Sequence, residues 1–182
     1  MARIYLVRHG KAAGSFGEAA DPGLDDQGHA QAAAMAARLA PQGPLALITS
    51  PLQRARDTAA PLARAWNATA AIEPRVAEIP SPTRDLAARA DWLRGIMDSS
   101  WDALDDTLTT WRRGILDVLG SFETDAVVVS HFMVINVAVG AATGDAHLVV
   151  FRPDNCSQTI IETDGTDLRL IARGDEAQTH VG

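Results

Sequence analysis

Short apolar runs alternate with longer amphipathic stretches along this chain, a pattern typical of strands that alternate with helices. Three apolar runs predict strands: Ile4–Val7, Leu45–Ile48 and Ala126–Val129. The last of these is continuous and β-branched, which predicts a strand buried on both faces. Helical patterns cover residues 25–39, 50–66 and 102–119, and a further helix is expected after residue 131. The second helix is expected to open with Ser50 as N-cap and Pro51 in its first turn.

The remaining segments complete the expected fold. Residues 70–79 are extended but interrupted by Pro74, and a turn at residues 80–83 leads into another helix. Three short runs predict antiparallel strands at one edge of the sheet: Leu148–Phe151, Gln158–Glu162 and Leu168–Ala172. The sequence therefore predicts an α/β fold, a three-layer α/β/α sandwich with a mostly parallel central sheet and antiparallel edge strands. Residues 1–174 are expected to form a single domain, and the polar segment 175–182 is expected to be a frayed tail.

Composition and charge narrow the classes of function. The 182 residues suffice for one domain with a buried core, and 47% of them are apolar. The net charge of −7 argues against partners that need a basic surface, so we predict no binding to nucleic acid or membranes. A single cysteine, Cys156, allows no internal disulfide, and the first residues lack a signal-peptide pattern. These features predict a cytoplasmic protein whose few cations must be gathered locally to bind an anion.

Cationic and imidazole side chains follow three of the expected strands. Arg8 and His9 follow the first strand, Arg54 lies a few residues after the second, and His131 follows the strand at 126–129. Ligands of open α/β sheets bind at the carboxyl ends of the strands. Helices that begin there also offer free backbone N–H groups to an anion. If these strands are parallel neighbours, the four side chains meet in a pocket suited to phosphate.

Four segments, in order along the chain, resemble the histidine phosphatase superfamily, also called the phosphoglycerate mutase-like or RHG family. The segments are Leu6–Gly10 (LVRHG), Leu24–Ala32 (LDDQGHAQA), Ser50–Ala59 (SPLQRARDTA) and Val128–His131 (VVSH). A lone RHG tripeptide would be weak evidence, whereas the ordered set is specific and spans most of the chain.

This resemblance implies roles for the residues at the strand ends. His9 corresponds to the nucleophile, while Arg8, Arg54 and His131 correspond to the groups that hold the transferring phosphoryl group. A neutral imidazole attacks phosphorus and forms a phosphohistidine, which divides hydrolysis into two easier steps. Arginines meet the charge on the phosphoryl oxygens bidentately, so neither a metal nor a cofactor is expected.

A carboxyl group is also needed to protonate the leaving oxygen and later to activate water. In the family a glutamate after the strand that follows the second motif often supplies it, and Glu78 occupies that place. Its apolar neighbours would desolvate the carboxyl group and raise its pKa, as a general acid requires. Glu73 and Asp85 remain alternatives for this role.

Departures from the family pattern bear on the activity. Phe132 stands where a glycine usually follows the second histidine, and it would resist a positive φ there. Residues 11–13 differ from those of phosphoglycerate mutases, and the chain is shorter, which favours a small phosphatase. A mutase and a weakly catalytic phosphate-binding or regulatory module remain alternatives. The expected partner is a small phosphorylated molecule or a phosphohistidine protein. Asn155 and Ser157 are expected near the site in supporting positions.

Overall fold

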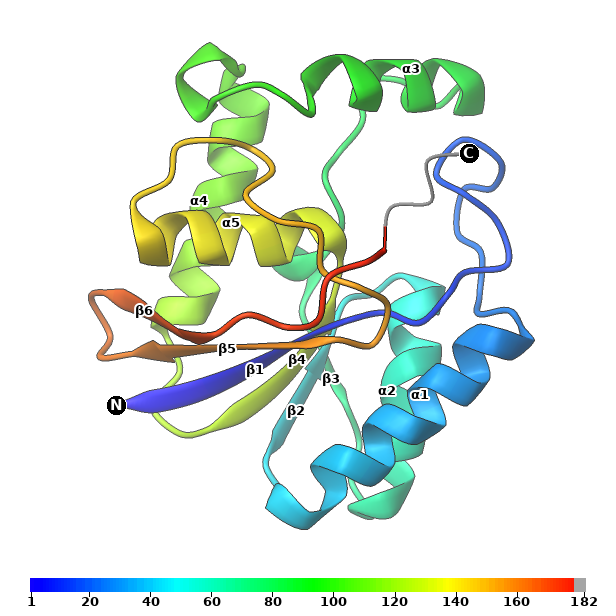
Figure 1. Ribbon diagram of the computed structural model, residues 1–182, viewed down its shortest axis with the longest axis vertical. Helices are drawn as coiled ribbons and strands as arrows, with labels where there is room; N and C mark the ends of the chain where they lie inside the picture. Colours follow the sequence, from blue (N-terminus) through cyan, green and yellow to red (C-terminus); the bar gives the residue numbers. More distant parts are fainter. Residues whose placement is uncertain (179–182) are drawn as a thin grey trace.

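The computed structural model describes residues 1–178, and its centre is a six-stranded mixed sheet (Figure 1). The strands are β1 (Ala2–Arg8), β2 (Ala46–Thr49), β3 (Ala71–Ile72), β4 (Ala126–Ser130), β5 (Gln158–Thr163) and β6 (Leu168–Ala172). Their order across the sheet is β3-β2-β4-β1-β5-β6. The first four strands in this order are parallel, and β5 and β6 each run antiparallel to the strand before them. The predicted α/β fold with antiparallel strands at one edge is confirmed.

Helices cover both faces of the sheet. They are α1 (Asp26–Leu39), α2 (Gln53–Ala65), α3 (Leu86–Ile96), α4 (Asp106–Gly120) and α5 (Phe132–Thr143). α1 and α2 lie on one face and α4 and α5 on the other, whereas α3 lies beyond α4 and α5, away from the sheet (Figure 1). Short 3₁₀ turns at residues 40–42, 74–76 and 101–103 connect these elements. Among residues 1–178, no helix combines the length and the apolar character needed to cross a bilayer.

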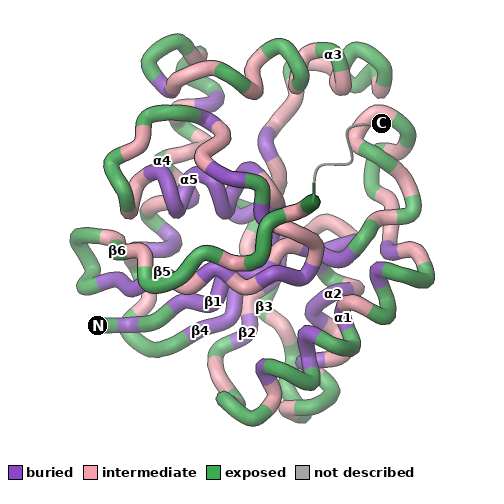
Figure 2. The backbone as a smooth tube through the Cα atoms, viewed as in Figure 1, coloured by how far each residue is buried: buried purple, intermediate pink, exposed green. Residues whose placement is uncertain are grey.

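The two cores follow from the alternation of side chains along the strands. Ile4 and Leu6 of β1 contribute to the core under α4 and α5, while Tyr5 and Val7 contribute to the core under α1 and α2. All five residues of β4 are buried, which confirms that this strand is covered on both faces (Figure 2). Burial on both sides holds β1 and β4 in one register at the centre of the sheet, and their carboxyl ends become a rigid support.

The strand expected at Leu148–Phe151 does not form. Leu148 and Phe151 are buried as their apolar character suggests, but the backbone N–H groups of Val150 and Phe151 donate to Oδ1 of Asn136 on α5, at 2.7 and 3.0 Å. The Asn136 side chain thus accepts the hydrogen bonds that the carbonyl groups of a neighbouring strand would otherwise accept. The prediction was wrong because apolar spacing reports burial and not the partner of the backbone.

Two element boundaries also differ from expectation. α2 begins at Gln53 with Leu52 as its N-cap, so Ser50 does not cap it; the backbone at Leu52 is still extended, with ψ of 142°. The segment expected to fray from residue 175 is hydrogen-bonded as far as residue 177. Asp154 N–H donates to the Asp175 carbonyl, and Ala177 N–H donates to the Arg152 carbonyl, both at 2.8 Å. Residues 179–182, the rest of that predicted tail, lie outside the described residues.

Candidate active site

The register of the sheet brings the two predicted histidines together. β1 and β4 are parallel neighbours in which Arg8 pairs with Ser130, so His9 and His131 leave the same edge side by side. His9 N–H donates to the Ser130 carbonyl at 3.0 Å, and the centroids of the two imidazole rings are 5.2 Å apart. Both side chains are buried, as is Arg54 from the first turn of α2. The four side chains expected at this edge are therefore neighbours in the folded chain.

Glycine is required where the chain turns after His9. A Cβ atom on Gly10 would lie 2.7 Å from the carbonyl oxygen of Gly28 in α1, and a Cβ atom on Gly28 would collide with the carbonyl of Lys11. Gly10 N–H also donates to Oγ1 of Thr58 on α2, at 2.9 Å. The glycines of two separate motifs thus serve one purpose, since they let the loop after β1 pass directly over the first turn of α1.

The two ring nitrogens of His9 have different environments. Nδ1 lies 2.7 Å from the Gly10 carbonyl oxygen, which can only accept, so Nδ1 carries the proton. Nε2 then has the lone pair, and it accepts a hydrogen bond from Arg54 Nε at 3.2 Å. Burial, followed by the charges of Arg54 and Arg8, lowers the pKa of His9 to about 3. The ring is therefore neutral near neutral pH, with an unprotonated nitrogen facing the arginine.

His131 contacts Ser50, the residue that was expected to cap α2. Its Nε2 lies 2.7 Å from Oγ of Ser50, and that oxygen also accepts the N–H of Leu52 at 3.2 Å. Both side chains are fully buried. Within residues 1–178 the other partner of Ser50 Oγ is the Leu52 N–H, a donor, so the Ser50 hydroxyl proton is directed to Nε2. Burial, His9 and the two arginines hold the pKa of His131 well below its ordinary value. The neutral ring therefore carries its proton on Nδ1, which has no hydrogen-bond partner.

The turn before β5 holds the start of the loop after β1. Arg8 Nη1 donates to the Pro153 carbonyl at 2.8 Å, while its buried Nε has no partner. Asn155 Nδ2 donates to the His9 carbonyl at 2.9 Å, and the Ser157 carbonyl accepts Arg8 N–H at 3.3 Å. Asn155 and Ser157 thus lie next to Arg8 and His9, in the supporting positions that were expected for them.

Phe132 causes no backbone strain at its position. It is the first residue of α5, and its backbone is helical rather than in the positive-φ region. The Arg8 guanidinium carbon lies 5.4 Å from the centroid of its ring, within the range of a cation–π contact. The resistance expected of a phenylalanine at this position therefore does not arise, and the ring contributes to the wall of the site.

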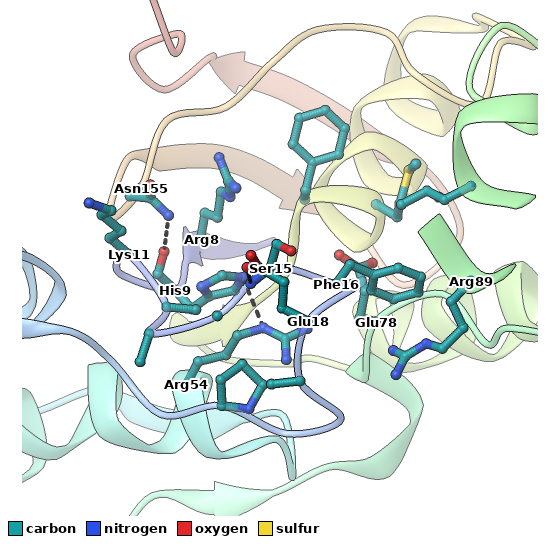
Figure 3. Close-up of a pocket in the computed structure, with 18 of the residues that line it drawn as sticks. Arg8, His9, Lys11, Ser15, Phe16, Glu18, Arg54, Glu78, Arg89 and Asn155 are labelled. Atoms are coloured by element: carbon teal, nitrogen blue, oxygen red, sulfur yellow. Dashed lines mark hydrogen bonds between the residues drawn. The ribbon is translucent and has the colours of Figure 1, made fainter. Parts of the chain in front are cut away.

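Glu78, like Glu18 and Asp25, is a carboxyl group that lines the cavity beside these residues. It lines the same cavity of about 680 Å³ as Arg8, His9 and Arg54 (Figure 3). Burial raises its pKa, against the opposing effects of the Ile79 N–H, which donates to its Oε1 at 2.9 Å, and of the two arginines.

The segment that carries Glu78 is fixed on two sides. Ser130 Oγ donates to the Val76 carbonyl at 2.7 Å, and Trp111 Nε1 donates to the Ala77 carbonyl at 3.1 Å. The two alternative carboxylates have other partners. Glu73 pairs with Arg75, and Asp85 accepts the Ala88 N–H as the N-cap of α3. Neither lines the cavity, so the geometry favours Glu78 among the three.

Comparison with known proteins shows the family of the chain. The family model described as "Histidine phosphatase superfamily (branch 1)" matches residues 4–176. The chain belongs to this superfamily. Among curated proteins, the bifunctional protein Rv2228c of Mycobacterium tuberculosis is 31% identical over 165 residues, which are 78% of this chain and 45% of that protein. The chain thus spans less than half the length of this relative.

Solved structures share the histidine phosphatase fold. A mycobacterial glucosyl-3-phosphoglycerate phosphatase in complex with VO3 superposes with a TM-score of 0.70 at 22% identity, covering 97% of this chain and 100% of that one. A phosphoserine phosphatase from Entamoeba histolytica, in complex with 3-phosphoglyceric acid, superposes with a TM-score of 0.73 at 20% identity. That match covers 96% of this chain and 98% of the neighbour. At these identities the likeness establishes the fold.

Some residues of this candidate site were not predicted from the sequence. Ser50 and Thr58 lie inside a quoted family motif, yet the spacing gave no reason to place their hydroxyls against His131 and Gly10. Phe16 and Arg89 also line the cavity, and they belong to no motif (Figure 3). Only the tertiary contact between the loop at residues 12–20 and α3 brings this last pair together.

Proposed function

We propose that this protein is a phosphatase that hydrolyses a phosphomonoester or a phosphoramidate through a phosphohistidine on His9. The observation that carries the proposal is the state of the His9 ring. Its Nδ1 is held by the Gly10 carbonyl, and its pKa is lowered to about 3, so Nε2 has a free lone pair beside two arginines. A neutral imidazole with an oriented lone pair is the form that attacks phosphorus.

In the first step, the Nε2 lone pair forms a bond to phosphorus while the bond from phosphorus to the leaving group breaks. Arg8, Arg54 and the Nδ1–H of His131 bind the equatorial oxygens, where negative charge develops. The unpartnered Nε of Arg8 and Nδ1 of His131 support this role, because both are buried donors that need an acceptor. The hydrogen bond from Arg54 to His9 passes to a phosphoryl oxygen when substrate enters.

Glu78 supplies the proton that the leaving oxygen or nitrogen takes up. Its raised pKa supports this role, because a carboxyl group must be protonated at working pH to act as an acid. In the second step, the Glu78 carboxylate takes a proton from water, the water oxygen bonds to phosphorus, and the bond to Nε2 breaks. Inorganic phosphate leaves, and the protonated acid and the neutral imidazole are both restored.

Phosphorylated small molecules are the substrates typical of the superfamily. The named activities of two structural neighbours, on glucosyl-3-phosphoglycerate and phosphoserine, support phosphate esters as the substrate class here. Every group in the proposed steps is an amino-acid side chain, so the activity is expected to be independent of added metal.

The proposal is tested with p-nitrophenyl phosphate in the presence of EDTA. We expect turnover by the unaltered chain, no turnover by His9→Ala, and normal turnover by His29→Ala, which removes an exposed histidine on α1. An alkaline quench should preserve an acid-labile phosphoenzyme in the unaltered chain only. Turnover that persists in His9→Ala would refute the assignment of the nucleophile, and an inactive unaltered chain across a panel of phosphates would refute the phosphatase.

A further inference from the structure

The cavity continues well beyond the groups around His9. Its outer part is bounded by the loop of residues 12–20 and by one face of α3. Loop and helix are in direct contact, since a Cβ atom on Gly17 would lie 2.9 Å from that of Ala90. The proposed reaction uses no residue of this outer part. Its side chains are therefore available to contact the rest of the substrate.

Arg89 presents an unusual cation to this outer part. Its guanidinium carbon lies 4.1 Å from the centroid of the Phe16 ring, so the two side chains stack. Its Nε is buried without a hydrogen-bond partner, and no carboxylate within residues 1–178 forms an ion pair with it. Stacking orients the plane of the guanidinium but leaves the buried Nε–H without an acceptor.

The position of Arg89 suits contact with a second group of the substrate. Figure 3 shows it at the opposite end of the pocket from Lys11 and Asn155, with Glu78 and Phe16 between it and His9. A leaving group departs on the side of the acid that protonates it. Arg89 therefore lies where the leaving group of the proposed reaction extends.

Among the residues that the structure describes, no charged group around the cavity pairs with Arg89. Lys11 is paired with Asp25 at 3.3 Å, and Glu18 accepts the Ser15 N–H at 2.8 Å on the loop. Burial lowers the pKa of Arg54, and the positive charge of Arg89 adds to this effect, so the two guanidinium groups repel each other. In the proposed reaction, a phosphoryl group beside His9 pairs with Arg8 and Arg54 and leaves the charge of Arg89 unpaired.

We propose that Arg89, stacked on Phe16, binds a second anionic group carried by the leaving group of the substrate. This inference rests on the proposed phosphatase function and adds a substrate class: phosphate esters whose alcohol part bears a carboxylate or a further phosphate. The arginine fork matches the paired oxygens of either anion. An uncharged leaving group would leave the buried Nε–H of Arg89 without an anionic partner.

Three-carbon phosphate esters that differ only at the far end provide the test. Esters ending in a hydroxyl, a carboxylate or a second phosphate are compared by kcat/KM in the unaltered chain, Arg89→Met and Arg89→Lys. Arg94→Met is the matched control, because Arg94 is an exposed arginine of the same helix that pairs with Asp91. Affinities of the same esters are also measured by calorimetry in the His9→Ala background, with and without Arg89→Met, where no turnover interferes.

We expect the unaltered chain to favour at least one anionic ester over the hydroxyl ester by about 10- to 100-fold, the range of a charge-assisted hydrogen bond. Arg89→Met should abolish this preference, Arg89→Lys should retain part of it, and Arg94→Met should leave it intact. The two anionic esters show whether carboxylate or phosphate is preferred. Equal kcat/KM for all three esters in the unaltered chain, or a preference that survives Arg89→Met, would overturn the inference.

Failure of the inference and failure of the phosphatase are separable. p-Nitrophenyl phosphate has no second anionic group, so its turnover by the unaltered chain reports on the chemistry at His9 alone. Turnover of that ester without discrimination among the three-carbon esters would refute the role of Arg89 and leave the phosphatase standing. Absence of all turnover, with no affinity difference in the His9→Ala background, would refute both.

Discussion

Replacing His9 by glutamine should make the fold less sensitive to acid. In the folded chain the pKa of His9 is lowered to about 3 by burial and by two arginines, whereas an unfolded imidazole has its ordinary value of 6.5. As pH falls below 6.5, the unfolded chain takes up a proton that the folded chain refuses. Stability is therefore lost progressively from about pH 6.5 towards pH 3. Glutamine does not titrate, and its carbonyl oxygen can still accept from Arg54.

The size of the effect follows from these two values. Between about pH 7 and about pH 4.5, the difference in proton uptake at one such histidine amounts to about 2.5 kcal/mol. The buried ring of His131 and the acid Glu78 are present in both chains. Because His9 is uncharged in the folded chain above its pKa of about 3, its replacement leaves their titration over this interval nearly unchanged. The unaltered chain should thus lose about 2.5 kcal/mol more than His9→Gln over this interval.

Urea unfolding, followed by circular dichroism at both pH values, measures this difference. His29→Gln is the control, because it removes an exposed histidine of α1 and should leave the acid sensitivity unchanged. Parallel losses of stability in the unaltered chain and His9→Gln would refute the reasoning. Such a result would mean that the imidazole is readily protonated in the folded state, and the neutral nucleophile of the proposed mechanism would fail with it.

Three further predictions concern single side chains. Glu78→Gln should lower kcat for alkyl phosphates by about 100-fold or more, and it should affect p-nitrophenyl phosphate less, because the nitrophenolate leaving group needs no proton. In the unaltered chain, kcat/KM for alkyl phosphates should fall as pH rises through the raised pKa of Glu78. Equal losses of kcat on both substrates would contradict the role of Glu78 as the acid. Ser50→Ala should lower kcat/KM by about tenfold, Ser50→Thr should restore it, and ¹⁵N spectra should show the proton of His131 leaving Nδ1 only in the alanine variant. Gly28→Ala should destabilise the fold by about 1–3 kcal/mol by thermal unfolding, because its Cβ would collide with a backbone carbonyl. Gly95→Ala, in the last turn of α3 where a Cβ meets open space, should stabilise the fold by up to about 1 kcal/mol.

The sequence predicted the side chains that leave the ends of central strands. Arg8 ends β1, while His9 and His131 directly follow buried strands, and parallel pairing of neighbours brings such residues to one edge. The conformation of the loops did not have to be known, because the pairing of neighbouring strands determines where these side chains lie. Arg54 was predictable for a related reason, since α2 begins at the same edge, although it starts later than the Ser50-Pro51 signal suggested.

Residues whose partners are distant and polar could not be predicted in this way. The Asn136 side chain accepts the backbone N–H of Phe151 in place of a neighbouring strand. Nothing in the apolar pattern around Phe151 indicates that contact. Ser50 was expected to cap α2, but the helix begins only at Gln53 with Leu52 still extended, and the Ser50 hydroxyl contacts His131 instead. Arg89 lies on a half-exposed helix where an arginine is ordinary, and only its stacking on Phe16 distinguishes it.

The proposed chemistry requires two opposite protonation states in one cavity, and burial favours both. Removing water disfavours the charged form of any group, so it keeps the His9 imidazole free of a proton and raises the pKa of Glu78 towards the protonated form. The arginines act differently on the two groups: they reinforce the effect at His9 and oppose it at Glu78. Burial must therefore raise the pKa of Glu78 by more than the two arginines lower it, and burial is the largest contribution to this pKa. Opening the wall near Glu78 to water should consequently impair the acid before it impairs the nucleophile, because only the acid depends on burial alone.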